Sequence, residues 1–283
     1  MKKKIVLFTV IAIVAALSLS VLLAGCTTVD MSKAGPDEIK EYGKLVVATS
    51  PDFPPFENLE DGEIVGWDID VANELAKMLG VELEIKSMAF DAVLASVATG
   101  KAHIGMAGIS YSAKRDETMD FSVNVYDSQQ VIIVRADNNE INGPMDLEGK
   151  TVAVQAGTIG NWLAEMEEDY AYTTNENNEK VARLGTPSSV SALDSGLTAI
   201  QRVKTDHADA VILDKLTAQE IVASLNAQGG DQLKILETSV YGDAYAFAIG
   251  EGNVKLKEWI DAAYQELVDN GTIARLNEKW NIE

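Results

Sequence analysis

Short apolar runs alternate with segments of helical periodicity along most of the chain. Continuous apolar runs at 44–49, 102–109 and 130–135 predict buried strands. Between the first two runs, apolar residues at 68–79 recur on one helical face, and 91–99 predicts a second helix. This part of the chain therefore predicts strands and helices in alternation.

The alternation restarts after the polar stretch 146–150. The expected elements are strands at 151–155, 208–213 and 233–236, and helices at 215–225, 254–269 and 272–280. Alternating strands and helices favour an α/β fold with parallel sheets, in which ligands bind at the carboxyl ends of strands.

The beginning of the chain has the pattern of an export signal. Three lysines at 2–4 precede an apolar run over 5–24, and small residues follow. The order Leu23-Ala24-Gly25-Cys26 resembles a bacterial lipobox, so 1–25 is predicted to be a lipoprotein signal peptide and Cys26 to carry a diacylglycerol. Cys26 is the only cysteine of the sequence, which excludes a disulfide within the chain. The alternative is an uncleaved anchor, although the apolar run is near the lower limit for a span.

Acidic residues outnumber basic ones, 44 to 23, and the formal net charge is −21. Such a charge repels nucleic acid and anionic lipid, so we expect no nucleic-acid partner and membrane attachment only through Cys26. The polar stretch 26–43 predicts a flexible, lipid-anchored tether. The rest of the chain is long enough for two lobes.

The segment 105–115 predicts a site for a small carboxylate. Gly108 and Ser110 are small enough to let a ligand reach backbone groups. Ser112 is a good N-cap, so free N–H groups and the positive end of a helix face one point. Arg115 adds a planar, charged fork that matches a carboxylate. The alternative is an ordinary strand–turn–helix with a solvated arginine.

Further motifs precede and follow this segment in a fixed order. They are Phe53-Pro54-Pro55-Phe56-Glu57, Val65-Gly66-Trp67-Asp68-Ile69-Asp70-Val71-Ala72, Met119-Asp120-Phe121-Ser122, Asp146-Leu147-Glu148-Gly149-Lys150-Thr151, Gly157-Thr158 and Ala208-Asp209-Ala210-Val211. From about residue 44 to 280, the chain resembles the polar amino acid-binding proteins of bacterial ABC importers. These are family 3 extracellular solute-binding proteins with the type II periplasmic-binding-protein fold, here in a lipoprotein form.

The resemblance implies two Rossmann-like lobes joined by two crossover strands. We expect lobe 1 at 44–134 and 240–283, and lobe 2 at 135–239. The implied function is capture of a free L-amino acid between closing lobes and delivery to an ABC permease and ATPase. The implied protein is a monomer without a cofactor, anchored by lipid at the outer face of the cytoplasmic membrane.

The resemblance also assigns the site residue by residue. Arg115 matches the arginine that holds the ligand's α-carboxylate, helped by amide groups near Ser110 and Thr158. Asp214 matches the aspartate that holds the α-ammonium group, together with the Gly108 carbonyl and the Ser110 hydroxyl. The alternative for Asp214 is the N-cap of the following helix.

Phe53 and Trp67 match aromatic walls around the ligand's side chain, and their alternative is ordinary core. The positions expected to set side-chain selectivity are Ser50, Gln155, Ile159 and Leu213. Ser50 stands where relatives that bind basic or amide side chains usually carry an aspartate. None of the four is charged, so we expect a neutral polar, aliphatic or aromatic amino acid. Asp52 and Asp243 are the first candidates for an acid that this interpretation misplaces.

Motifs for catalysis or metal binding do not occur in the sequence. His103 and His207 are the only histidines, and neither has a second histidine at metal-ligand spacing. The sequence thus predicts a binding protein rather than an enzyme. Two alternatives remain open: a surface sensor that signals to a membrane receptor, and a dehydratase or lyase, which needs a free acid or base in the pocket.

Overall fold

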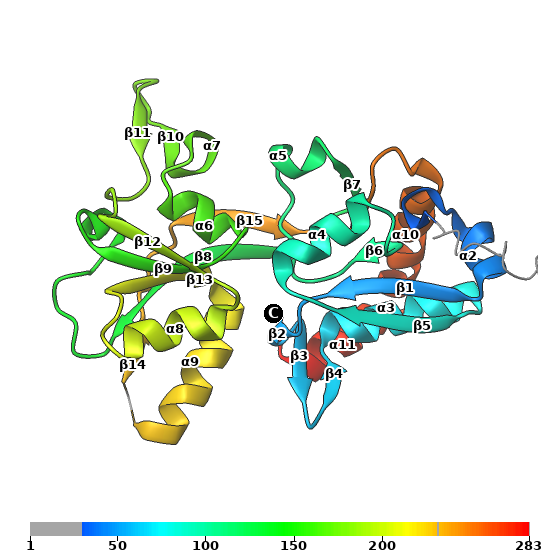
Figure 1. Ribbon diagram of the computed structural model, residues 1–283, viewed down its shortest axis with the longest axis horizontal. Coiled ribbons are helices and arrows are strands. Elements are labelled where there is room, and N and C mark those ends of the chain that lie inside the picture. The colour runs from blue at the N-terminus through cyan, green and yellow to red at the C-terminus, as the bar shows by residue number, and fades with distance from the viewer. Residues whose placement is uncertain (1–29, 231, 283) are drawn as a thin grey trace, which may run out of the picture. The chain divides into compact units, whose positions relative to one another are not determined.

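The computed structural model describes residues 30–230 and 232–282. The predicted signal peptide and Cys26 lie outside these residues. Two sheets, each covered by helices on both faces, organise the described chain (Figure 1). We call each sheet with its helices a lobe.

Lobe 1 contains a five-stranded sheet in the order β5-β1-β6-β16-β7. Its strands are β5 (Glu82–Ser87), β1 (Lys44–Thr49), β6 (Ile104–Gly105), β16 (Ala248–Gly250) and β7 (Met119–Phe121). Its helices are η1 (Met31–Lys33), α2 (Pro36–Tyr42), α3 (Trp67–Leu79), α4 (Phe90–Ala98), α5 (Ala113–Asp116), α10 (Val254–Asp269) and α11 (Thr272–Trp280). A small sheet joins β2 (Asp52–Phe53), β3 (Glu57–Glu60) and β4 (Glu63–Val65).

Lobe 2 contains the sheet β12-β9-β13-β8-β14, with β15 also paired to β8. Its strands are β12 (Ser189–Leu193), β9 (Thr151–Gln155), β13 (Ala210–Asp214), β8 (Tyr126–Arg135), β14 (Leu233–Ile235) and β15 (Tyr241–Tyr245). Its helices are η2 (Pro144–Leu147), α6 (Ile159–Ala164), α7 (Glu168–Ala171), α8 (Gly196–Lys204) and α9 (Lys215–Gly229), and β10 (Tyr172–Thr174) pairs with β11 (Lys180–Ala182).

Alternation along the strands explains why both faces of each sheet are covered. On β1, Val47 packs in the cluster that contains α3, whereas Val46 packs with Val93 of α4. On β9, Val152 packs with α6 and Ala153 packs with α8. Strands buried on both faces read as continuous apolar runs, which is how the sequence revealed them. The sheets are nevertheless mixed, because β8 and β16 run antiparallel to their neighbours.

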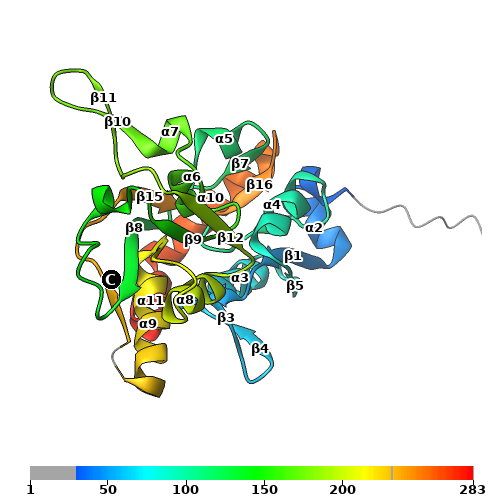
Figure 2. The same ribbon diagram turned by 60° about the vertical axis from the view of Figure 1, so that its left-hand side comes forward.

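By sheet membership, the chain passes between the lobes at 122–125 and 246–247, whereas we expected the lobe bounds at 134–135 and 239–240. Strand β8 pairs antiparallel with β13, Ile133 opposite Val211, so lobe 2 begins at Tyr126 rather than after 134. Strand β15 also pairs with β8, so lobe 2 extends to Tyr245 rather than ending at 239. β8 and β15 lie side by side next to the crossings (Figures 1 and 2). An apolar run indicates that a strand is buried, but it does not indicate which of the two sheets the strand joins.

The expected tether is wrong for residues 31–42, which form η1 and α2. Ile39 of α2 is fully buried against lobe 1, and Gly43 ends the helix at a φ of 82°. A helix of seven residues with one buried side chain is too short to show a helical period in the sequence.

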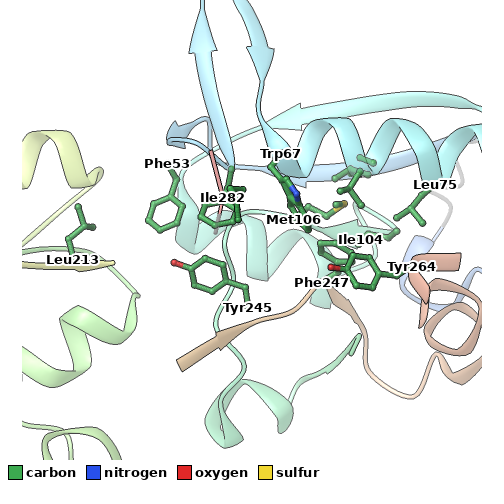
Figure 3. Packing of buried hydrophobic residues seen from close by; sticks show 14 of the residues in the cluster. Phe53, Trp67, Leu75, Ile104, Met106, Leu213, Tyr245, Phe247, Tyr264 and Ile282 are labelled. Carbon is green, nitrogen blue, oxygen red and sulfur yellow. The ribbon is translucent and has the colours of Figure 1, made fainter. Parts of the chain in front are cut away.

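A buried aromatic cluster lies at the border of lobe 1 with the crossings. The ring centroid of Phe56 lies 6.2 Å from that of Trp67 and 5.1 Å from that of Tyr245. Phe53 and Tyr245 lie at one end of this cluster, with Trp67, Phe247 and Tyr264 further into lobe 1 (Figure 3). Each buried aromatic side chain stabilises the fold by roughly 1.5–3 kcal/mol through removal of apolar surface from water.

Candidate functional site

A small pocket is lined by nine of the ten residues that we predicted to bind ligand. Those lining it are Ser50, Phe53, Gly108, Ser110, Arg115, Gln155, Thr158, Ile159 and Asp214, together with Asp52, Glu57, Phe90 and Ala107. They come from both lobes. The free volume is about 10 Å³, roughly the space that one water molecule needs.

Arg115 extends from the short helix α5 into this pocket. Ser112 begins the helix, and its hydroxyl accepts from the Arg115 N–H at 3.2 Å. The guanidinium donates through Nη1 to the Ser110 carbonyl and through Nη2 to the Gly157 carbonyl of lobe 2, the latter at 2.9 Å. Burial lowers the pKa of Arg115 to about 10, so the side chain stays charged at neutral pH.

Two aromatic rings hold the Arg115 side chain in place. The guanidinium carbon lies 5.4 Å from the ring centroid of Phe90 and 4.9 Å from that of Trp162. Such cation–π contacts fix the orientation of the planar fork. The buried Nε has no hydrogen-bond partner among the described residues.

Asp214 ends β13, and its carboxylate does not cap helix α9. Instead, Oδ1 accepts from the Tyr245 hydroxyl at 2.6 Å and from the Ser128 hydroxyl at 3.1 Å. The N-cap alternative is therefore wrong for the side chain. Burial raises the pKa of Asp214, and the hydrogen bonds from Tyr245 and Ser128 oppose that rise. A cation brought to this carboxylate would stabilise its charged form.

Gly108 and Ser110 line the pocket beside these charges. Gly108 has a φ of 52°, and its N–H donates to Asp68 Oδ2 at 3.2 Å. A Cβ at Gly108 would stand 2.5 Å from the Phe53 ring, so only glycine fits. The Ser110 hydroxyl donates to Asp243 Oδ2 at 2.6 Å.

The start of α6 lines the side of the pocket that lobe 2 contributes. Thr158 caps this helix, since its hydroxyl oxygen accepts from the Asn161 N–H at 3.2 Å. The same hydroxyl donates to the Gln155 carbonyl at 2.8 Å. N–H groups in the first turn of a helix have no partner within the helix, so the N–H of Ile159, which lines the pocket, is available to an anion.

Asp52 is an acid that we did not place in the pocket. It accepts from the Ser50 hydroxyl at 2.8 Å and from Gln155 Nε2 at 3.1 Å. Burial raises its pKa, which these hydrogen bonds partly oppose. The expectation that the pocket beyond Arg115 and Asp214 is neutral is therefore wrong. Of the four uncharged residues on which it rested, Ser50 and Gln155 are hydrogen-bond partners of Asp52.

Comparison with known proteins shows the family of this chain. The family model of bacterial extracellular solute-binding proteins, family 3, matches residues 45–283. The chain belongs to this family. It is 29% identical over 266 residues to the arginine-binding extracellular protein ArtP of Bacillus subtilis, covering 93% of this chain and 96% of that protein. It is 28% identical over 262 residues to the L-cystine-binding protein TcyJ of Escherichia coli, covering 92% and 91%.

Solved structures of similar proteins have the same two-lobed fold. Holo ArgBP from T. maritima is 35% identical, with a TM-score of 0.71 and coverage of 86% of this chain and 98% of that one. The two-lobed periplasmic-binding-protein fold is thus confirmed, and relatives in this family are amino acid-binding proteins of transporters rather than enzymes. Within residues 30–230 and 232–282, no helix combines the length and the apolarity that crossing a membrane requires.

Trp67, the tenth predicted residue, lies away from the pocket of this family 3 protein. It is 1% exposed, and its indole N–H donates to Asn277 Oδ1 at 2.7 Å in lobe 1. Ordinary core is therefore the right interpretation for Trp67, and Phe90 is the second aromatic residue in the pocket lining. Leu213 is also core and does not line the pocket.

A pair of buried carboxyl groups underlies the pocket, and sequence reasoning missed it. Glu57 and Asp68 are 0% and 3% exposed. Burial, and then the negative charge of Asp68, raise the pKa of Glu57 well above its ordinary range. Burial likewise raises the pKa of Asp68 to about 7. Both residues stand in the motifs that carried the family resemblance, which is the signal that could have marked them.

Histidine takes no part in this site. Nδ1 of His103 accepts from the Val46 N–H at 2.9 Å, and burial lowers the pKa of His103 to about 4. His207 is exposed and contacts the Thr205 hydroxyl. No group of His, Cys, Asp or Glu in the described part of the chain is arranged to hold a metal ion.

Proposed function

We propose that this family 3 protein captures a free L-amino acid between its lobes and delivers it to the permease and ATPase of an ABC importer. The observation that carries the proposal is the convergence of Arg115 and Asp214, two buried opposite charges, on one pocket. A zwitterion gives each of these charges an opposite partner, which offsets the cost of burying them.

Each end of the ligand has its own set of partners. The α-carboxylate binds the Arg115 fork, with N–H groups near Thr158 completing the site from lobe 2. The α-ammonium group donates to Asp214, the Gly108 carbonyl and the Ser110 hydroxyl. Because the free volume is only about 10 Å³, an amino acid enters when the lobes are apart and is enclosed when they close.

The side-chain part of the pocket favours a cationic amino acid. Asp52 accepts two hydrogen bonds that hold its carboxylate in the lining, and Phe53 and Phe90 add flat apolar faces. A guanidinium group pairs with a carboxylate and stacks on aromatic rings. We therefore propose arginine as the leading ligand, in line with the names of several relatives. The neutral amino acids expected from the sequence are the alternative.

Calorimetry with a panel of amino acids tests the function, preceded by mass spectrometry of small molecules that copurify. We expect L-arginine to bind the wild-type protein and Arg115→Ala to abolish binding without unfolding it. Removing one partner of a buried charge pair costs ~2–5 kcal/mol, or roughly 30-fold to several thousand-fold in affinity. Near wild-type affinity in the variant would overturn the site. Binding of neutral amino acids alone would restore the alternative.

We propose that a diacylglycerol on Cys26 holds the protein at the outer face of the cytoplasmic membrane, on the strength of the lipobox-like order at 23–26. Two acyl chains anchor far more firmly than one. Cell fractionation of Cys26→Ala tests this, since the variant should leave the membrane fraction. Retention of Cys26→Ala would instead indicate an apolar segment that is never cleaved.

A further inference from the structure

Asp243 of β15 does not line the pocket, yet it bonds directly to a residue that does. Its Oδ2 accepts from the Ser110 hydroxyl at 2.6 Å and from Gln130 Nε2 at 3.4 Å. The shorter distance is typical of a hydroxyl that donates to an ionised carboxylate. The other oxygen, Oδ1, is buried and has no hydrogen-bond partner among the described residues.

The direction of this hydrogen bond decides what Ser110 offers a ligand. A hydroxyl has one proton to donate and two lone pairs that accept. Because the Ser110 proton goes to Asp243, its lone pairs remain for a group that donates. With its proton turned to the pocket, Ser110 would repel an ammonium group instead of accepting from it.

We propose that Asp243 is a positioning residue for ligand binding: it holds Ser110 as a hydrogen-bond acceptor and so makes the site select ligands with an α-ammonium group. This inference rests on the proposed function. It gives the strand β15, beside the crossing between lobes, a part in choosing the ligand through Ser110.

The charges around Asp243 add a second consequence. The groups that face it are Arg115 of α5, Asp214 of β13, Gln130 of β8, Ser110, and Tyr241 and Tyr245 of β15. Burial, and then the charge of Asp214, raise the pKa of Asp243 to about 7. An ammonium group at the site favours the ionised carboxylate, so binding near pH 7 should release protons. Well above pH 7, Asp243 is already ionised and the release should fade.

A double-mutant cycle with Ser110→Ala, Asp243→Ala and the double variant tests the inference, with L-arginine as the calorimetric probe. Each single variant should lose roughly tenfold to hundredfold in affinity. Since Asp243 acts through Ser110, the double variant should bind about as well as Ser110→Ala alone. Additive losses, or wild-type binding by Asp243→Ala, would overturn the inference. Asp127→Ala is the matched control, because it removes an exposed acid from the neighbouring strand β8.

Two further measurements separate positioning from a structural role. 5-Guanidinopentanoate, which lacks the amino group, should bind wild type and Asp243→Ala equally, whereas a merely distorted site would weaken both ligands. In phosphate and Tris buffers at pH 7, the wild type should release protons on binding arginine and Asp243→Ala should release fewer. If the wild type binds no amino acid, the proposed function fails and this inference fails with it. If arginine binds and requires Arg115 but the cycle is additive, only this inference fails.

Discussion

Gln155 donates through Nε2 to Asp52 Oδ2 at 3.1 Å, although 103 positions separate the two residues in the chain. Gln155 ends β9 of lobe 2 and Asp52 belongs to β2 of lobe 1. The bond therefore joins the lobes at the pocket lining. In the function proposed above, this part of the pocket faces the ligand's side chain, so closure of the lobes and recognition of the side chain depend on the same contact.

Asp52→Asn should shift the ligand preference away from cationic amino acids. A guanidinium group in the pocket loses its carboxylate partner, at a cost of ~2–5 kcal/mol, while a neutral side chain loses little. A thermal-shift panel of amino acids, followed by calorimetry, measures the change. Asp61→Asn, an exposed residue at the β3–β4 turn, serves as the control. Unchanged affinity for arginine in Asp52→Asn would mean that Asp52 is not the side-chain partner.

Asp214→Asn should weaken arginine binding more than it weakens binding of 5-guanidinopentanoate. The substitution removes the charge opposite the α-ammonium group and leaves the carboxylate site at Arg115 intact. The amide can still accept from Tyr245 and Ser128, so the protein should fold. Calorimetry with both ligands gives the difference. Equal losses for the two would exclude Asp214 as the ammonium partner.

Local pattern predicted several regular elements closely, but the strand expected at 102–109 is wrong in its bounds, because β6 contains only Ile104–Gly105. The strands at 44–49 and 151–155 and the helices at 254–269 and 272–280 have the bounds that we expected. Ser112 caps α5 as its residue type favours. In each case the apolar pattern or the cap can be recognised from residues that are close together in the sequence.

What the sequence did not reveal depends on contacts between distant segments. Strand β8 reads as a buried strand in either lobe, and only its pairing with β13 assigns it. Tryptophan is suited both to a core and to the wall of a ligand site, so the residue type of Trp67 does not decide between the two. Asp52 lines the pocket and accepts from Gln155 of the other lobe, a contact that the sequence does not reveal. The pattern of apolar positions indicates which residues are buried, but it does not indicate which residues they contact.

Lys114→Ala should weaken ligand binding modestly, in a manner that depends on salt. Lys114 of lobe 1 pairs with Glu167 of lobe 2 at 2.8 Å and lies over the Trp162 ring. An exposed pair contributes up to about 1 kcal/mol, or about fivefold in affinity. Calorimetry at low salt and at 1 M salt should show the loss shrinking. Lys150→Ala is the control, because Lys150 pairs with Glu140 within lobe 2. Equal effects of the two variants would argue against a contact that stabilises closure.

Gly108→Ala should lower both Tm and ligand affinity. A methyl group there would stand 2.5 Å from the Phe53 ring, on a backbone at a φ of 52°. Strain of this kind costs on the order of 1–3 kcal/mol. Gly62→Ala is the matched control, since Gly62 has a φ of 87° with nothing within 4 Å of the added methyl. If both variants lose the same Tm and Gly108→Ala binds normally, the close approach of Phe53 does not shape the site.

Glu57→Gln should stabilise the protein more at pH 8 than at pH 5. The pKa of Glu57 in the fold lies well above its ordinary value of 4.5, because burial and the neighbouring Asp68 disfavour the charged form. The folded state therefore binds a proton that the unfolded chain has already lost, and stability falls as pH rises above 4.5. Glutamine does not titrate, so the difference in Tm between variant and wild type should grow with pH. The exposed Glu63→Gln is the control. A Tm difference that is the same at both pH values would show that the buried carboxyl pair holds no such proton.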